Sequence, residues 1–224
     1  MGCTIDVVSI GTLSNNPFWN EQGKVRAPHA TTVLIRDGGT TILVDPSLPS
    51  ELLIHRLDER TGLKPEQIDV VFLTSFRPVH RRSLGAFESA RWLMSEEERS
   101  SVVVSLSAAL AEVDGGAGTV VSSPVEVQHE LALAQRTEPA PERLGPTVQL
   151  FPSPGATVGT AGLLVAGLKT TVIAGDAVLT RDHFEHGRVF ERSADPDQAR
   201  QSFADIVEIA DIIVPGHDNV IVAA

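Results

Sequence analysis

The chain has 224 residues, of which 42% are apolar and 21% charged, a composition that excludes disorder, collagen and coiled coil as accounts of the whole chain. Its 29 acidic residues outnumber its 18 Lys and Arg, and the net charge of −11 argues against nucleic acid and anionic membrane as partners. The single cysteine excludes an internal disulfide, and no apolar run is long enough to span a membrane. Because the N-terminus shows no secretory leader, we expect a soluble cytoplasmic protein.

The first third of the chain predicts a β-hairpin. Two β-branched apolar runs, 31–35 and 41–44, lie on either side of a short turn that contains two glycines. The register of such a hairpin places Asp45 opposite Thr31 or Thr32. An acidic side chain is therefore expected where the second strand of the hairpin ends.

The middle of the chain predicts helices around one buried strand. The run 69–74 is almost continuously apolar, as expected for a strand buried on both faces. Helices are expected over 50–61, capped by Ser50 and ended by Gly62; over 84–93; over 95–110, begun by a capping box at Ser95; and over 124–136. Residues 114–118 predict a break, and 137–146 predict a loop.

The last third of the chain returns to strands. Strands are expected over 148–151, 162–165, 170–174 and 211–214, with a helix that begins at Pro196 and runs to about Ile209. This order is not a regular alternation of strands and helices. It favours an α+β protein in which two sheets pack together with helices outside.

Polar residues follow four of the predicted strands: Asp45, the segment 75–80, Asp176 and His217. Loops held at the ends of rigid strands are common places for functional sites. Two histidines and one aspartate from three such loops would supply the three protein ligands typical of catalytic zinc sites or of iron(II) sites. From these residues alone, hydrogen-bonded structural histidines remain an alternative.

Five blocks of the sequence together resemble the metallo-β-lactamase superfamily over nearly the whole chain. They are 42–46, 68–74 with the following hexad, 153–159, 172–177 and 210–217. The resemblance implies an αββα four-layer sandwich, formed as a single domain over 1–224, with a metal site at one edge of the paired sheets. Residues 95–146 match no block of the family, and we expect them to form a helical insertion that acts as a lid or a dimer surface. The tail from Leu164 to His217 is most similar to the branch that contains human metallo-β-lactamase domain-containing protein 1.

The departures from the family pattern all fall on one metal site. The family hexad is His-x-His-x-Asp-His, whereas residues 75–80 here are Ser-Phe-Arg-Pro-Val-His. The resemblance implies that Ser75, Arg77 and Ala156 replace the three histidines of the first metal. The second site keeps His80, Asp176 and His217 and loses only an aspartate, now Val79. One divalent ion (zinc, iron or manganese) is therefore implied, with His80 and Asp176 as the candidate catalytic residues.

Arg77 allows two interpretations. A guanidinium is always charged, so it cannot be a metal ligand and would oppose a second divalent ion. With Ser75 beside it in the vacated site, it could bind a carboxylate or phosphate of a ligand. Alternatively, Arg77 pairs with Asp176 and no metal is needed. The resemblance also implies that Asp45 lies behind the metal ligands rather than among them, and His29, at the site end of the hairpin, could replace a missing ligand.

Two functions follow from these alternatives. The first is a hydrolase relative with one metal, acting weakly or not at all on an ester, thioester or lactone, because Val79 leaves the hexad without a carboxylate base. The second is a non-catalytic protein of the same fold that binds a small anion through Arg77, or a protein partner. His183 and His186 are three apart, which suits one helical face or a solvated loop. A homodimer, the commonest assembly, is possible, and the sequence leaves the oligomeric state open.

Overall fold

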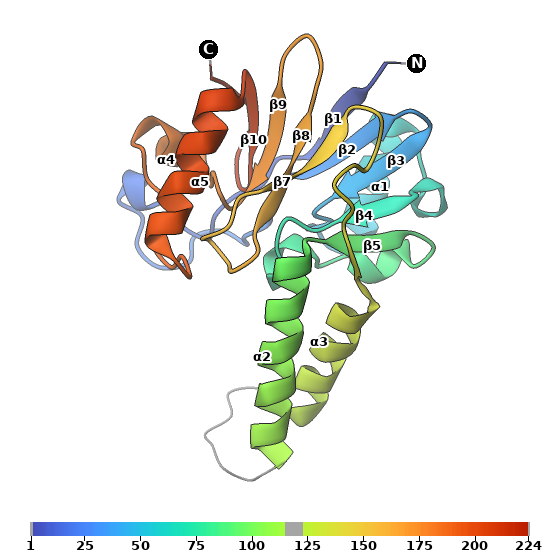
Figure 1. Cartoon of the computed structure of the whole chain (residues 1–224), viewed down its shortest axis with the longest axis vertical. Helices are drawn as coiled ribbons and strands as arrows, with labels where there is room; N and C mark the ends of the chain where they lie inside the picture. The colour runs from blue at the N-terminus through green and yellow to red at the C-terminus, as the bar shows by residue number, and fades with distance from the viewer. Residues whose placement is uncertain (1, 115–122, 224) are drawn as a thin grey trace.

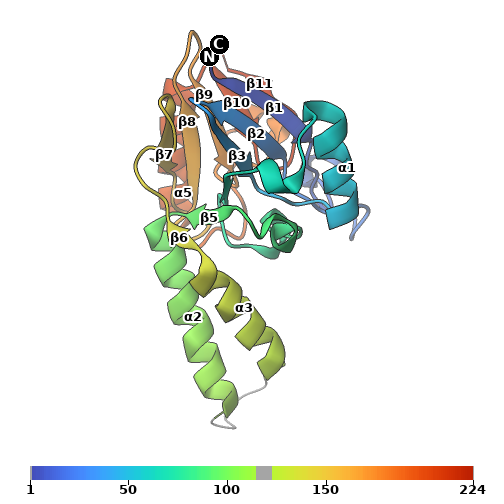
Figure 2. The same ribbon diagram turned by 90° about the vertical axis from the view of Figure 1, so that its right-hand side faces the viewer.

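The computed structural model describes residues 2–114 and 123–223. Two β-sheets pack face to face, with helices on their outer sides (Figures 1 and 2). The first sheet has the order β1-β2-β3-β4-β5-β6. Its strands are β1 (Thr4–Ser9), β2 (Thr32–Asp37), β3 (Thr40–Val44), β4 (Val70–Phe72), β5 (Arg91–Met94) and β6 (Glu138–Pro139). The second sheet has the order β11-β10-β9-β8-β7. Its strands are β7 (Val148–Pro152), β8 (Ala161–Val165), β9 (Thr171–Gly175), β10 (Ile212–Pro215) and β11 (Ile221–Val222).

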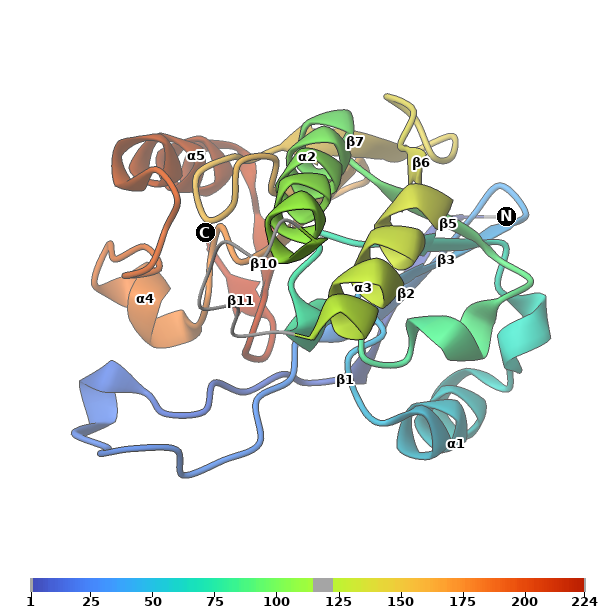
Figure 3. The same ribbon diagram turned by 90° about the horizontal axis from the view of Figure 1, so that it is seen from below.

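The helices complete the layers. They are α1 (Ser50–Thr61), α2 (Glu96–Asp114), α3 (Pro124–Arg136), α4 (Arg181–Glu185) and α5 (Pro196–Ile209). Short 3-10 turns cover Pro17–Trp19, Pro65–Gln67, Pro78–His80 and Leu84–Phe87. Figure 3 shows α1 and α5 on opposite outer sides of the two sheets. The order of layers is therefore helix, sheet, sheet, helix.

Alternation along the strands explains this layering. In β2, Val33 and Ile35 belong to the core between the two sheets, whereas Leu34 belongs to the core that also holds Leu53 of α1. In the second sheet, Val172 packs in a third core with Ile206 of α5. Because successive side chains of a strand point to opposite faces, each sheet buries both of its faces.

Helices α2 and α3 form a hairpin that projects away from the sheets (Figures 1 and 2). The hairpin lies between β5 and β6 in the chain, and α3 has the bounds 124–136 expected from the sequence. Ser123 caps α3 through a hydrogen bond from the N–H of Glu126 to its hydroxyl. The expected break at 114–118 lies outside the described residues from 115 onward.

The structure confirms the register of the first hairpin but corrects one helix cap. Val33 pairs with Val44, so Asp45 lies opposite Thr32, and the Thr32 hydroxyl donates to the Asp45 carbonyl over 2.6 Å. Ser50 does not cap α1. It is the first helical residue, and Pro49 holds the cap position without any side-chain hydrogen bond.

The helix expected over 84–93 is wrong. A 3-10 turn covers Leu84–Phe87, and Arg91–Met94 forms β5, which pairs in parallel with β4. Trp92 faces the outer core and Leu93 faces the core between the sheets, as alternate strand residues do. Neither β6, which lies inside the expected loop 137–146, nor β11, which follows the last expected strand, was predicted. Among the helices of the described residues, none combines the length and apolarity needed to cross a membrane.

Candidate metal centre

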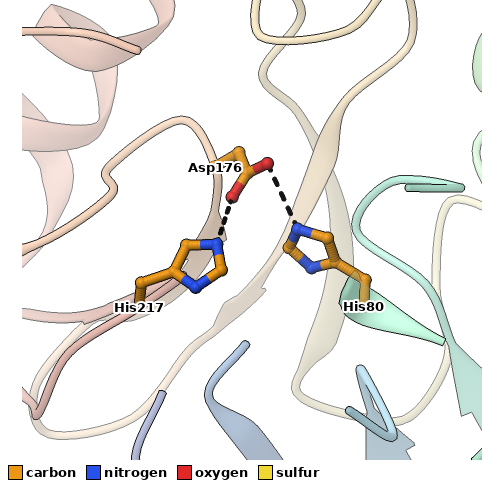
Figure 4. A group of neighbouring side chains, drawn as sticks. All are labelled: His80, Asp176 and His217. Atoms are coloured by element: carbon orange, nitrogen blue, oxygen red, sulfur yellow. Dashed lines mark hydrogen bonds and ion pairs between the residues drawn. The ribbon is translucent and has the colours of Figure 1, made fainter. Parts of the chain in front are cut away.

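Three side chains from three loops meet at one edge of the paired sheets (Figure 4). His80 ends the turn that follows β4, Asp176 follows β9 and His217 follows β10. Their candidate ligand atoms all lie within 4.8 Å of one another. All three residues are buried, with exposed fractions of 0% for His80, 1% for Asp176 and 6% for His217.

The backbone brings Asp176 and His217 together because β9 and β10 are parallel neighbours. Their carboxyl ends lie side by side, and Pro215 pairs with Gly175. Gly175 has a φ of 53°, and a Cβ placed there would lie 2.5 Å from Oγ1 of Thr74. Only glycine combines this left-handed conformation with so close an approach to Thr74. The turn thereby directs Asp176 toward the loop that carries His80.

His217 is oriented by a main-chain group. Its Nδ1 lies 2.9 Å from the carbonyl oxygen of His29. A carbonyl oxygen only accepts, so Nδ1 carries the hydrogen and Nε2 of the neutral ring is left with a lone pair. That Nε2 lies 3.1 Å from Oδ1 of Asp176.

His80 is oriented in the same sense by a carboxylate. Its Nδ1 lies 2.9 Å from Oδ2 of Asp45, and its Nε2 lies 3.2 Å from Oδ2 of Asp176. Asp45 is itself held by Thr74, whose N–H donates to Oδ1 over 2.9 Å and whose hydroxyl donates to Oδ2 over 2.6 Å. Asp45 has a φ of 50°, a conformation that aspartate tolerates better than most residues.

The charges around His80 and Asp176 favour a cation in this group of residues. Burial alone would lower the pKa of His80, but the carboxylates of Asp176 and Asp45 raise it to about 10. Burial of Asp176 works toward a higher pKa, yet His80 and His217 hold the pKa of this carboxyl well below its usual value. Two buried carboxylates therefore face two imidazoles in a setting that stabilises a cation.

The donor set fits a divalent metal ion. Both imidazoles donate Nδ1–H away from the group, to Asp45 and to the His29 carbonyl, and both direct Nε2 at the carboxylate of Asp176. Where a ring is neutral, its Nε2 lone pair faces a carboxylate oxygen, which is repulsive unless a metal ion lies between them. Without a metal, the raised pKa of His80 allows a proton on its Nε2 to take that place. Metal-ligating histidines show this pattern, with the second nitrogen bonded to a carboxylate or carbonyl.

Arg77 contacts Asp176, one of the three candidate ligands. Its Nη1 donates to Oδ2 of Asp176 over 2.6 Å, and its guanidinium lies over the ring of Phe190 at 4.3 Å. Ser75 is fully buried, and its hydroxyl has no hydrogen-bond partner among the described residues. Ala156 supplies only a methyl group here, and Val79 is partly exposed and lines the cleft beside His217.

The side chain of His29 does not join the group. Its Nδ1 lies 3.3 Å from the carbonyl of Ala27 and its Nε2 lies 3.0 Å from the carbonyl of Ile10. His29 serves the site through its main-chain oxygen instead, because the hairpin brings this carbonyl to Nδ1 of His217. This contact carries no signal in the sequence, since any residue at position 29 offers a carbonyl.

His183 and His186 lie at the short helix α4 rather than in a solvated loop. His183 is buried, and burial is the main cause that lowers its pKa. The ring of Phe18 lies edge-on to His183 at 5.0 Å and stacks on His186 at 4.5 Å. These contacts hold the 13–28 loop, which contains Phe18, against α4. His183 thus helps to line the cleft but is not part of the His80, Asp176 and His217 group.

Two hollows, the cleft and the cavity, adjoin the site, and Arg77 lines both. The cleft has a volume of about 560 Å³ and is bordered by the 13–28 loop, Val79, His183 and His217. The cavity has a volume of about 450 Å³ and lies between α2 and the turn at 156–158. Pockets of this size are common for small molecules.

Comparisons with known proteins agree with this architecture. Residues 26–74 match the sequence model of the Metallo-beta-lactamase superfamily, and no curated protein sequence matches the chain. A candidate metallo-beta-lactamase from Thermotoga maritima is 18% identical, with a TM-score of 0.70 and coverage of 99% of both chains. A candidate metal-dependent hydrolase from Staphylococcus aureus is 14% identical, with a TM-score of 0.70, over 96% of this chain and 89% of that one.

A further similar structure is AidC, described as a dizinc quorum-quenching lactonase. It is 16% identical, with a TM-score of 0.63, over 80% of this chain and 67% of its own. Identities this low carry the fold and not the activity. The chain therefore has the metallo-β-lactamase fold, and over residues 26–74 it carries the sequence pattern of that superfamily.

Proposed function

We propose that His80, Asp176 and His217 bind one divalent metal ion and that the protein is a single-metal relative of metallo-β-lactamase-fold hydrolases. One observation carries this proposal: both imidazoles donate Nδ1–H outward and direct Nε2 at the same buried carboxylate. Zinc, iron and manganese all accept a set of two imidazoles and one carboxylate.

Each residue has a defined task in this proposal. His80 and His217 offer Nε2, and Asp45 and the His29 carbonyl hold the two rings in the required tautomer. Asp176 offers carboxylate oxygens to the shared centre. A bound ion would supply Lewis acidity that lowers the pKa of water toward neutrality. The cleft beside His217 gives a substrate access to this centre.

The residues where the family resemblance implies a first metal do not fit one. Ser75 and Ala156 provide no imidazole or carboxylate, and Arg77 is a fixed cation whose Nη1 lies 2.6 Å from Asp176. A second ion would face charge repulsion from this guanidinium. Val79 offers no carboxylate to take up a proton. We therefore expect hydrolysis to be weak or absent.

Metal analysis tests the proposal directly. Protein purified without chelators is analysed by mass spectrometry for zinc, iron and manganese, together with the His217→Ala and His55→Ala variants. We expect about one equivalent of metal in the wild type and in His55→Ala, since His55 lies exposed on α1 and is not one of the three candidate ligands. Loss of metal is expected in His217→Ala. A wild-type protein without metal, even after incubation with each ion, would contradict the proposal.

A substrate panel then tests catalysis. Esters, thioesters and lactones are offered to the metal-loaded wild type and to His217→Ala. Turnover that depends on both the ion and His217 would make the protein a hydrolase. The absence of turnover from a metal-loaded protein would make it a metal-binding protein of this fold without this activity.

The contact between Arg77 and Asp176 favours a second candidate, a non-catalytic protein that binds a small anion. One N–H of the guanidinium is bonded to Asp176, and the others remain to face the two hollows. In this alternative a proton on Nε2 of His80 takes the place of the metal between His80 and Asp176. A metal-free protein with anion binding that depends on Arg77 would favour this candidate.

A further inference from the structure

The cavity beside the metal centre combines an apolar wall with the guanidinium groups of Arg77, Arg81 and Arg192. Val102 and Leu106 of α2 and Val158 of the opposite turn contribute aliphatic side chains to it. Arg77 and Arg192 line this cavity and also line the cleft that holds His217. The two arginines therefore stand at the boundary between the apolar cavity and the cleft.

The acidic residues of the cavity are already paired. Glu130 of α3 forms an ion pair with Arg81. Glu98 is buried, and its carboxylate accepts hydrogen bonds from the N–H of Phe76 over 2.8 Å, from the Thr157 hydroxyl over 2.7 Å and from the N–H of Gly159 over 3.2 Å. Neither carboxylate forms an ion pair with Arg77 or Arg192 in the described part of the chain.

The boundary arginines keep unused hydrogen-bond donors. Arg192 is exposed and forms no hydrogen bond or ion pair with another described residue. Arg77 uses Nη1 on Asp176 and is held over Phe190, which leaves its other N–H groups available. Ala156, with only a methyl group, lets the cavity extend toward Arg77. Three guanidinium groups and two carboxylates line the cavity, and Arg192 is unpaired among the described residues, so the cavity favours a negative ligand even in a protein with a net charge of −11.

We infer that this cavity binds a small amphipathic carboxylate, with its apolar chain against Val102, Leu106 and Val158 and its carboxylate between Arg77 and Arg192. Guanidinium groups bind carboxylates through paired hydrogen bonds. The aliphatic wall favours a hydrocarbon chain at the other end of the ligand, because burying apolar surface there is favourable. The carboxylate end of such a ligand lies at the boundary next to the cleft. As a statement about the substrate class, the inference rests on the proposed function; as a statement about binding, it does not require a metal.

Calorimetric titration with three probes tests the binding. Octanoate, kept below the concentration at which it forms micelles, is compared with octanol, which lacks the charge, and with acetate, which lacks the chain. We expect octanoate to bind at least about tenfold more tightly than either. The full-length protein is titrated as purified and again after chelator treatment. A missing metal would then overturn the proposed function but not the cavity, and absent octanoate binding would overturn the cavity but not the metal site.

Matched variants assign the two halves of the ligand. Arg192→Met should weaken octanoate by about tenfold and leave octanol unchanged, whereas Arg188→Met, an exposed arginine outside the cavity, should change neither. Leu106→Ser should weaken octanoate and octanol together, and Val104→Ser, on an exposed part of α2 away from the cavity, should not. Octanoate that binds no better than acetate, or that is indifferent to Arg192→Met, would overturn the inference.

Discussion

Arg77 donates from Nη1 to Oδ2 of Asp176 over 2.6 Å, and this is the same oxygen that lies 3.2 Å from Nε2 of His80. One carboxylate oxygen is thus shared by a fixed cation and a candidate metal ligand. A divalent ion at the group would compete with Arg77 for Oδ2 and would also be repelled by the guanidinium. We therefore expect Arg77 to limit how tightly the proposed centre binds a metal.

Replacing Arg77 with methionine should strengthen metal binding. Arg77→Met removes the fixed charge and frees Oδ2 of Asp176, so we expect zinc affinity to rise by about tenfold. Competition with a chromophoric chelator measures the change. Arg82→Met serves as the control, because Arg82 is an exposed arginine whose side chain, among the described residues, donates only to the Pro28 carbonyl. A weaker affinity in Arg77→Met would show that the guanidinium supports the site, and an unchanged affinity would show that it does not affect metal binding; either result contradicts the prediction.

Much of the candidate site is predictable from the sequence because it depends on strand ends. Asp176 and His217 directly follow apolar strands, and parallel pairing of those strands brings their ends together. The hairpin register that places Asp45 opposite Thr32 follows from the two β-branched runs and the turn between them. The strand ends and the hairpin register are local, so short patterns of residues determine them, whereas the parallel pairing of β9 with β10 joins distant segments.

The features that sequence alone does not predict depend on tertiary contacts. Leu84, Phe87 and Ala90 have helical spacing, yet Trp92 and Leu93 lie in a strand because they face two different cores. The role of His29 is carried by its carbonyl, for which the side chain gives no signal. Thr74 has no distinctive motif either, although its two hydrogen bonds fix Asp45.

Asp45 should control metal affinity without touching the metal. In Asp45→Asn the amide still tolerates the φ of 50°, but it cannot supply two charged acceptors to His80 and Thr74. Loss of a carboxylate behind a metal-ligating histidine commonly lowers metal affinity by about 10- to 100-fold. Chelator competition on Asp45→Asn measures this, and Asp69→Asn, on an exposed residue, is the control. Equal affinity in both variants would contradict the positioning role.

Glu98 should stabilise the two loops that face the cavity. Its buried carboxylate joins α2 to Phe76 and to the turn at Thr157 and Gly159. In Glu98→Gln, one acceptor oxygen becomes an NH₂ group that faces existing donors, so the free energy of unfolding should fall by about 1–3 kcal/mol. Urea denaturation measures the loss. The neighbouring Glu97→Gln, on an exposed residue, should stay within about 0.5 kcal/mol of the wild type.

Val79 offers the most direct test of what limits hydrolysis. Its side chain lines the cleft beside His217, in the segment where the family resemblance implies a carboxylate. Val79→Asp would add a fourth candidate ligand and a group that can take up a proton, which commonly contributes about 100-fold or more to such reactions. We expect ester or lactone turnover to rise in Val79→Asp and not in the uncharged Val79→Asn, with metal content measured in both. If Val79→Asp binds metal more tightly but turnover stays at the level of Val79→Asn, the cation at Arg77 and the missing first site limit the reaction instead.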